Sequence, residues 1–383
     1  MDIPEQININ FPGKLVFGNG SLAQLAEEVA NTFAKKVLII TISPLVLQLQ
    51  DIIKEISSRR IDVLINTTII NEPTFADFKT LYEEVEEFNP DVVIGVGGGS
   101  VLDVAKLIAA QLDNDQTLYE YVGIGLLKQR KKKLICLPAT AGTGSEVSPN
   151  AILLDEDNQK KGIISQYLVP DLVIVDPLLT LSVPPAITAA TGLDALTHCL
   201  EAYTNKFAHP LIDMYALRGI QLIAGSLVEA VKNGSNKEAR SNVAMGSLLG
   251  GFCLGPVNTA AVHALSYPLG SMFHLAHGLS NALLLPYVIE YNLPASPAKY
   301  ADVAVALGCE KHADDVITAK KGIEKIRLVI SQCGIPSRLR EVNIPKEVIP
   351  GMAANALKIQ RLLKNNPRLI TEADAIEIYN AAY

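Results

Sequence analysis

Several features that other protein classes require are missing from this 383-residue chain. The segment 241–289 contains no Asp, Glu, Lys or Arg, and 49% of the whole chain is hydrophobic, so a membrane-spanning helix has to be considered. Pro256, Pro268 and Pro286 interrupt the segment. The chain contains no unbroken apolar run of about 18 residues, the length that a transmembrane helix requires. We therefore expect no membrane association and interpret the segment as helices that are buried on most sides.

Signs of secretion and of nucleic-acid binding are missing as well. Residues 1–5 show no basic region that leads into an apolar core, so we expect no secretion signal. The five cysteines are odd in number and scattered, which is typical of reduced thiols in a cytoplasmic protein. The net charge of −7 argues against a nucleic-acid partner. We interpret the one basic run, 128–133, as a solvated loop.

The first half of the chain alternates short apolar runs with helical patterns. The pattern predicts strands at 36–41, 61–65, 91–95, 133–138 and 172–177, and helices at 45–57, 75–88 and 101–111. Continuous apolar strands that alternate with helices indicate a parallel sheet covered on both faces. We therefore predict an α/β dinucleotide-binding domain over residues 1–182.

The composition changes after Pro184 and Pro185. Ala, Leu and Gly dominate the second half, and its apolar residues recur with a period near 3.6. A double proline is typical of the first turn of a helix. We predict that residues 183–383 form an all-helical domain that binds metal and substrate.

Four potential metal ligands occur in this second half. Asp194 and His198 are spaced i, i+4, so a helix places both side chains on one face. His263 and His277 lie in the uncharged segment. One carboxylate and three imidazoles suit a divalent transition metal, Fe²⁺ or else Zn²⁺ or another ion, and they leave room for a substrate oxygen. Glu201, on the same predicted helix as Asp194, is expected to pair or cap.

A glycine-rich loop, Gly97-Gly98-Gly99-Ser100, follows the third predicted strand. Such a loop brings backbone N–H groups and a helix N-terminus close to a phosphate. Its spacing differs from the GxGxxG fingerprint, and a tight turn that needs positive φ is the alternative interpretation.

A second loop at 139–147 follows the fourth predicted strand and carries Thr140, Thr143 and Ser145. Ligands of open α/β sheets bind at the carboxyl ends of parallel strands, where both loops are expected to lie. The two loops together therefore favour a dinucleotide site more strongly than either does alone.

These motifs together resemble the iron-containing (group III) alcohol dehydrogenase family over essentially the whole chain. The first glycine loop with Asp103 and Lys106 is similar to the family signature GGGSxxDxAK, and 191–198 is similar to its first ligand motif. The resemblance implies a dehydroquinate synthase-like α/β domain, an all-α C-terminal domain and a homodimer. It also implies a metal-dependent, NAD(P)-linked dehydrogenase for small-to-medium primary alcohols and aldehydes, with Lys160 reaching the cofactor.

Two positions depart from the family pattern. Ile42 stands where NAD-preferring members carry an Asp that binds the adenosine ribose, so we expect use of NADP or of both cofactors. Tyr267 stands where many members place a His near the substrate. Tyr267, or His274 on the helical face expected to carry His277, is a candidate to relay a proton, and a packing or structural role is the alternative for each. The apolar residues around Tyr267 suggest a substrate without charge.

Other functions remain possible at this point. A glycerol or polyol dehydrogenase and a maleylacetate-type reductase belong to the same superfamily, but they differ at the ligand positions that this chain retains. A dehydroquinate synthase-type lyase needs several cations to hold a sugar acid, and the uncharged segment argues against such a site. A non-catalytic nucleotide-binding protein does not explain the intact ligand set.

Overall fold

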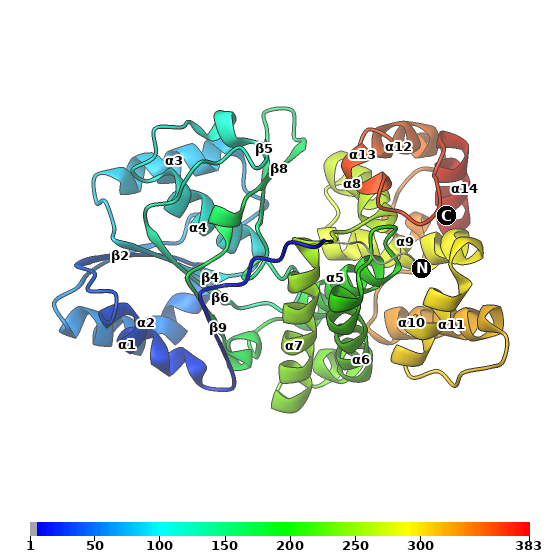
Figure 1. The fold of residues 1–383 in the computed structure, drawn as a ribbon, viewed down its shortest axis with the longest axis horizontal. Coiled ribbons are helices and arrows are strands. Elements are labelled where there is room, and N and C mark those ends of the chain that lie inside the picture. Colours follow the sequence, from blue (N-terminus) through cyan, green and yellow to red (C-terminus); the bar gives the residue numbers. More distant parts are fainter. Residues whose placement is uncertain (1–5) are drawn as a thin grey trace. The chain divides into compact units, whose positions relative to one another are not determined.

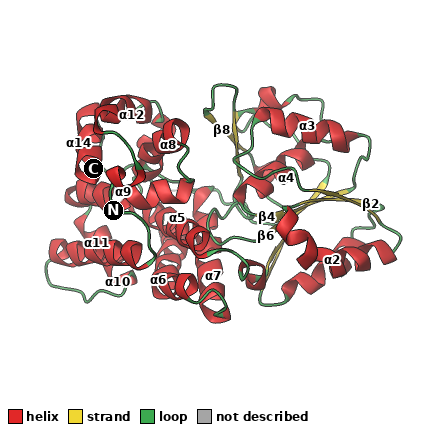
Figure 2. Ribbon diagram, turned by 180° about the vertical axis from the view of Figure 1, so that it is seen from behind, coloured by secondary structure: helices red, strands yellow, loops and turns green. Residues whose placement is uncertain are grey.

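The computed structural model describes residues 6–383, and residues 1–5, on which the expectation of no secretion signal rests, lie outside the described range. The chain divides into two compact units. The α/β unit comprises residues 10–140 and 144–181, and the helical unit comprises residues 182–383 together with 6–9 and 141–143. Figure 2 shows that the described strands all belong to the α/β unit.

Six parallel strands form the central sheet of the α/β unit in the order β1-β9-β6-β4-β2-β3. These strands are β1 Lys14–Phe17, β2 Lys36–Ile40, β3 Asp62–Asn66, β4 Val92–Gly97, β6 Lys133–Pro138 and β9 Leu172–Val175. The helices of this unit are α1 Leu25–Ala30, α2 Ser43–Ser58, α3 Phe75–Glu86 and α4 Gly99–Gln111. A smaller sheet, in the order β5-β8-β7, is built from β5 Gly123–Ile124, β8 Lys160–Ile164 and β7 Asn150–Leu154.

Helices cover both faces of the central sheet (Figure 1). α1 and α2 pack on the face that carries Val37, Ile39 and Ile94, whereas α3 and α4 pack on the face that carries Leu38 and Val93. Neighbouring residues of a strand point to opposite faces, and here both faces are buried. This explains why most positions in the strands are apolar, whereas polar residues such as Lys36 and Lys133 stand at strand ends. The predicted α/β fold with a parallel sheet is therefore confirmed.

The basic run at 128–133 is partly built into the protein. The Arg130 guanidinium donates to Asp171 Oδ2 at 2.6 Å and to backbone carbonyls, and Lys132 pairs with Asp113 at 2.7 Å. Burial raises the pKa of Asp171, but Arg130, the backbone N–H of Leu134 and Lys133 together outweigh it and hold that pKa below its ordinary value. The side chains of Arg130 and Lys132 are only 11% and 10% exposed, so the prediction of a solvated loop is wrong for both.

The helical unit contains the following helices: α5 Pro185–Thr204, α6 Pro210–Lys232, α7 Lys237–Leu254, α8 Ala261–Phe273, α9 His277–Asn292, α10 Pro297–Ala306, α11 Asp315–Gln332, α12 Ile349–Ala356, α13 Gln360–Leu363 and α14 Glu372–Ala382. α5 begins at Pro185, as the double proline predicts. The uncharged segment 241–289 supplies most of α7 and α9 and the whole of α8, and most of its side chains are buried. The interpretation of this segment as buried helices is therefore confirmed.

α6 is long and apolar enough to cross a membrane, judged by length and composition alone. Its buried residues include Ile212, Ile220, Ile223 and Leu227, which recur along one stripe and belong to the core of the helical unit. A stripe of this kind is typical of a helix that packs in a bundle. The length and composition of α6 are therefore weak support for a membrane span.

Candidate functional site

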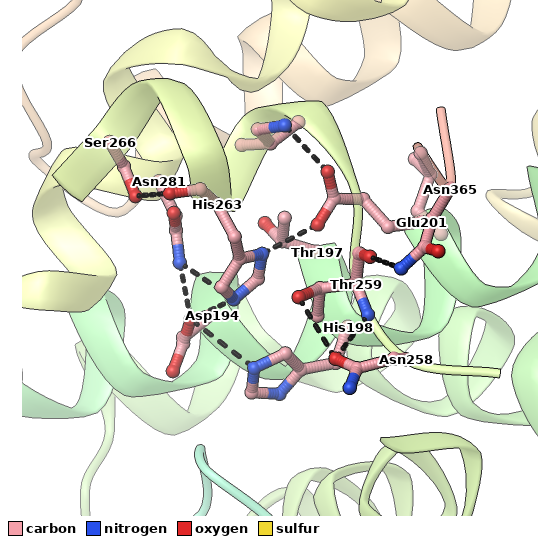
Figure 3. Close-up of polar contacts among 12 residues, drawn as sticks. Asp194, Thr197, His198, Glu201, Asn258, Thr259, His263, Ser266, Asn281 and Asn365 are labelled. Carbon is pink, nitrogen blue, oxygen red and sulfur yellow. Dashed lines mark hydrogen bonds and ion pairs between the residues drawn. The ribbon is translucent and has the colours of Figure 1, made fainter. Parts of the chain in front are cut away.

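The four predicted ligands meet inside the helical unit, where α5, α8 and α9 converge (Figure 3). Asp194 Oδ1 lies 3.7 Å from His198 Nε2, 3.5 Å from His263 Nε2 and 3.7 Å from His277 Nε2. Ligands of one ion lie about 2 Å from it, and hence within about 4 Å of one another. The three distances from Asp194 meet this condition.

His277 is the most exposed of the four predicted ligands, and the other three are buried. The side chain of His277 is 28% exposed, whereas that of His198 is 6% exposed and stacks on His263 with ring centroids 4.8 Å apart. Burial lowers the pKa of His198, which favours the neutral ring that binds metals. Ligand atoms of Asp194, His263 and His277 all lie within 4.8 Å of one another. The cluster is therefore open on the side of His277.

The local sequence explains how α5 and α9 approach each other. Asp194 and His198 project from one face of α5, as their spacing predicts. His277 is the first residue of α9, and a Cβ on the next residue, Gly278, would lie 2.2 Å from the carbonyl oxygen of Ala190. Only glycine fits there, so Gly278 allows α9 to bring His277 to the carboxylate of Asp194.

A buried carboxylate fixes the orientation of His263. Glu201 Oε2 lies 2.5 Å from His263 Nδ1, and Oε1 accepts from the backbone N–H of Val262 at 2.6 Å. A carboxylate only accepts, so Nδ1 carries a proton and Nε2 is the nitrogen that faces Asp194. Burial lowers the pKa of His263, but Glu201 and Asp194 outweigh it and raise that pKa to about 10. An ion that binds Nε2 at neutral pH therefore displaces a proton.

Asn281 belongs to the site and was not predicted. Its Nδ2 donates to Asp194 Oδ1 at 2.7 Å and lies 3.1 Å from His263 Nε2 and 3.4 Å from His277 Nε2. Burial raises the pKa of Asp194, but the imidazoles of His198, His277 and His263 together outweigh it, so that pKa lies well below its usual range. Asn281 follows His277 by four residues in α9, and this spacing was the signal available in the sequence.

Tyr267 and His274 have different surroundings. Tyr267 follows His263 by one turn of α8, and its ring centroid lies 6.1 Å from that of His277. Its hydroxyl oxygen accepts from Arg361 Nη2 at 2.9 Å. His274 is exposed and ends α8 in the left-handed conformation, with φ 54°. α8 ends before His274 and α9 begins at His277, so the prediction that His274 and His277 share a helical face is wrong.

The first glycine loop lies where β4 ends and α4 begins. None of Gly97, Gly98 and Gly99 has φ in the left-handed region, so the alternative interpretation of a turn that needs positive φ is wrong. A Cβ at Gly97 would lie 2.7 Å from the side chain of Val101, so this glycine permits a close approach of α4 to the strand. Gly98 to Ser100 are half-buried, and they place the start of a 13-residue helix at the surface of the α/β unit. Helix N-termini in this position bind phosphate.

A buried polar network fixes the second loop to α4. Lys106 is 0% exposed, and its Nζ donates to Ser145 Oγ at 2.8 Å and to the carbonyl oxygen of Asn150 at 2.8 Å. Asp103 accepts from Ser145 Oγ at 2.5 Å and from the N–H of Ile152 at 3.0 Å. Burial lowers the pKa of Lys106 and raises that of Asp103, and the charge of each partner counteracts the shift. Asp103 and Ser145, predicted to bind cofactor, therefore both bond within the protein.

The remaining predicted cofactor residues are spread over several elements. Ile42 directly precedes α2 and is half-buried. Because β2 and β4 are parallel neighbours, Ile42 lies at the same end of the sheet as the first glycine loop. Thr140 lies beside that loop, with Oγ1 3.4 Å from the position of a Cβ on Gly98. Lys160, in β8, pairs with Glu72 at 2.5 Å. Thr143 belongs to the residues that group with the helical unit.

Comparison with known proteins agrees with the fold and the ligand cluster. Residues 12–177 match the family model described as iron-containing alcohol dehydrogenase, and residues 188–383 match the model of the C-terminal part of the Fe-containing alcohol dehydrogenase family. The chain is 39% identical over 382 residues to long-chain-alcohol dehydrogenase 1 of Geobacillus thermodenitrificans, with 98% of this chain and 96% of the relative covered. It is 35% identical over 384 residues to 1,3-propanediol dehydrogenase of Citrobacter freundii, with 98% and 97% covered.

A solved structure of 1,3-propanediol oxidoreductase is similar as well, with a TM-score of 0.95, 33% identity, and 99% of this chain and 100% of that chain covered. The matches extend through both units and include the segments that carry the ligand cluster and the glycine loops. The chain therefore belongs to the iron-containing alcohol dehydrogenase family and is an oxidoreductase.

Proposed function

We propose that the protein is a metal-dependent, NAD(P)-linked alcohol dehydrogenase and aldehyde reductase for small-to-medium primary alcohols and aldehydes. The observation that carries this proposal is the convergence of the Asp194 carboxylate and three imidazoles inside the helical unit. This donor set fits a divalent transition metal. We assign Asp194, His198, His263 and His277 as its ligands, and Fe²⁺, or else Zn²⁺ or another divalent ion, as the metal.

Neighbouring side chains hold the proposed ligands in the orientation that this chemistry needs. When bound, the ion polarises the oxygen of the alcohol or aldehyde as a Lewis acid, and the nicotinamide carries the hydride. Glu201 keeps His263 Nε2 directed at the cluster, and Asn281 holds the carboxylate of Asp194 in place. The Tyr267 ring lies 6.1 Å from that of His277, whereas His274 is exposed beyond the end of α8, so we assign proton relay to Tyr267 rather than to His274.

We propose that the cofactor binds along the strand ends of the α/β unit. The start of α4 supplies backbone N–H groups for the pyrophosphate, and Ile42 lies at the same sheet edge. An isoleucine offers no acceptor to the hydroxyls of the adenosine ribose and no repulsion to a 2′-phosphate. The protein is therefore expected to accept NADP as well as NAD.

Replacement of Ile42 by Asp is expected to shift cofactor use towards NAD. The new carboxylate accepts from the ribose hydroxyls and repels a 2′-phosphate, and like charges in contact disfavour binding strongly. We expect the ratio of kcat/KM for NADPH to that for NADH to fall by about tenfold or more, which corresponds to about 1.4 kcal/mol or more. Ile42→Asn, uncharged and isosteric with Asp, is the control and should change the ratio less. An unchanged ratio in Ile42→Asp would contradict the placement of Ile42 at the ribose.

The proposed function is tested by metal removal. Anaerobically purified protein is expected to hold about one divalent ion per chain by mass spectrometry. NADPH or NADH oxidation against a panel of aldehydes should be lost after chelation and restored by Fe²⁺ or Zn²⁺. Undiminished aldehyde reduction by metal-free protein would overturn the metal-dependent function.

We further propose a cytoplasmic homodimer. All five cysteines are free thiols, as expected in a reducing compartment. The homodimer rests on membership of the family.

A further inference from the structure

We propose that Arg361, which Tyr267 positions beside the ligand cluster, forms an anion-binding arm, and that the preferred substrates carry a carboxylate at the end remote from the reacting carbon. This inference rests on the proposed function and deepens it, because it names the substrate class. The inference replaces the expectation of an uncharged substrate, which was drawn from the apolar residues around Tyr267.

The arm is built from two neighbouring contacts. Arg361 Nη2 donates to the Tyr267 hydroxyl at 2.9 Å, and the guanidinium carbon lies 5.9 Å from the centroid of the Tyr267 ring. The same ring lies 6.1 Å from that of His277. His277 is the most exposed of the four predicted ligands, so Tyr267 and Arg361 lie next to the side from which a substrate reaches the cluster.

Arg361 has no carboxylate partner. Within residues 6–383, no Asp or Glu oxygen lies within 4.0 Å of its guanidinium, whereas Arg130 pairs with Asp171 and Arg327 pairs with Glu290. Of its five N–H donors, one is used by Tyr267, and the others have no partner among the described residues. Arg361 is half-buried, and its guanidinium keeps N–H donors that can bind both oxygens of a carboxylate at once.

The helices α8 and α9 are almost free of charged side chains. The helices α8 and α9, which supply Tyr267 and two of the ligands, carry no Asp, Glu, Lys or Arg before Glu290. An anionic group that enters the site therefore meets Arg361 without competing acids from these helices. Since the Tyr267 ring lies about 6 Å from both His277 and Arg361, the carboxylate and the reacting carbon are separated by a short carbon chain.

The test compares two aldehydes of equal carbon number, 4-oxobutanoate and butanal, on the metal-loaded enzyme. The unsubstituted enzyme is expected to prefer 4-oxobutanoate. Arg361→Ala should lower the ratio of kcat/KM for 4-oxobutanoate to that for butanal by about 10- to 100-fold. A hydrogen bond to a charged group usually contributes a factor of about this size. The loss should appear mainly in KM, because the contact is made equally in the ground state and the transition state.

Two further variants separate charge from general structure. Arg361→Lys keeps the charge without the planar fork and should restore part of the ratio. Arg327→Ala removes a guanidinium of the same unit that pairs with Glu290, and it should leave the ratio unchanged. An equal loss for both aldehydes in Arg361→Ala, or a preference for butanal in the unsubstituted enzyme, would overturn the anion-binding arm.

A binding measurement keeps this inference separable from the proposed function. Calorimetry should detect succinate binding to the metal-loaded protein, weakened about tenfold or more by Arg361→Ala. If no aldehyde is reduced but succinate binding depends on Arg361, the proposed reaction fails and the anion site stands. If aldehydes are reduced but succinate binds both proteins equally, the anion site fails and the reaction stands.

Discussion

Aldehyde reduction should fall by about 10³-fold when Asp194 is replaced by Asn, because a metal acting as Lewis acid contributes several kcal/mol to the transition state. Asp194 is the one carboxylate among the four proposed ligands, and its Oδ1 lies within 3.7 Å of all three imidazoles. Asparagine keeps the shape of the side chain and removes its charge. Metal content per chain, measured together with kcat/KM for butanal, checks the expectation, and both should fall in parallel.

The matched control is Asp302→Asn in the same helical unit. Asp302 Oδ2 accepts from the Tyr203 hydroxyl at 2.7 Å and lies outside the ligand cluster. We expect its metal content to be unchanged and its kcat/KM to stay within about twofold, as for substitutions away from special features. Full metal content and activity in Asp194→Asn would show that the cluster does not hold the catalytic ion.

The parallel sheet could be predicted because most of its strands are buried on both faces and therefore contain continuous apolar runs, such as that from Val37 to Ile40. The strands that were missed lack this pattern. β1 is a four-residue edge strand whose first two residues are exposed, and β8 begins with Lys160 and Lys161 in a small sheet whose strands are mostly half-buried. Short and partly polar strands give no continuous apolar run, so their pairing depends on tertiary contacts that composition does not reveal.

The ligand cluster was predictable to the extent that it follows local spacing or family motifs. The i, i+4 pair in α5 follows from helical geometry, and His263 and His277 follow from the resemblance. The contact between Glu201 and His263 spans 62 residues, and that between Tyr267 and Arg361 spans 94, so neither leaves a periodic signal. The misplacement of His274 has a similar cause, because a non-glycine residue in the left-handed conformation ends α8 without the usual glycine.

Replacement of Lys106 by Met should lower the thermal midpoint of unfolding by roughly 10 °C. Methionine fills the volume but removes the cation, and it leaves the buried carboxylate of Asp103 with donors only from Ser145 and Ile152 among the described residues. Breaking a buried charge pair by removing one partner destabilises by about 3–5 kcal/mol. Each kcal/mol shifts the midpoint by about 2–4 °C in a domain of this size.

The same substitution should loosen the second loop, because Lys106 Nζ ties Ser145 and Asn150 to α4. Faster amide exchange at residues 144–150 and a higher KM for the nicotinamide cofactor are expected in Lys106→Met. The control is Lys79→Met, whose Nζ lies 3.8 Å from Glu83 with both side chains mostly exposed. An exposed pair of this kind contributes about 0–1 kcal/mol, so the control should move the midpoint by only a few degrees. Equal shifts in the two variants would mean that the buried network does not stabilise the α/β unit, and the loop would then need another explanation for its position.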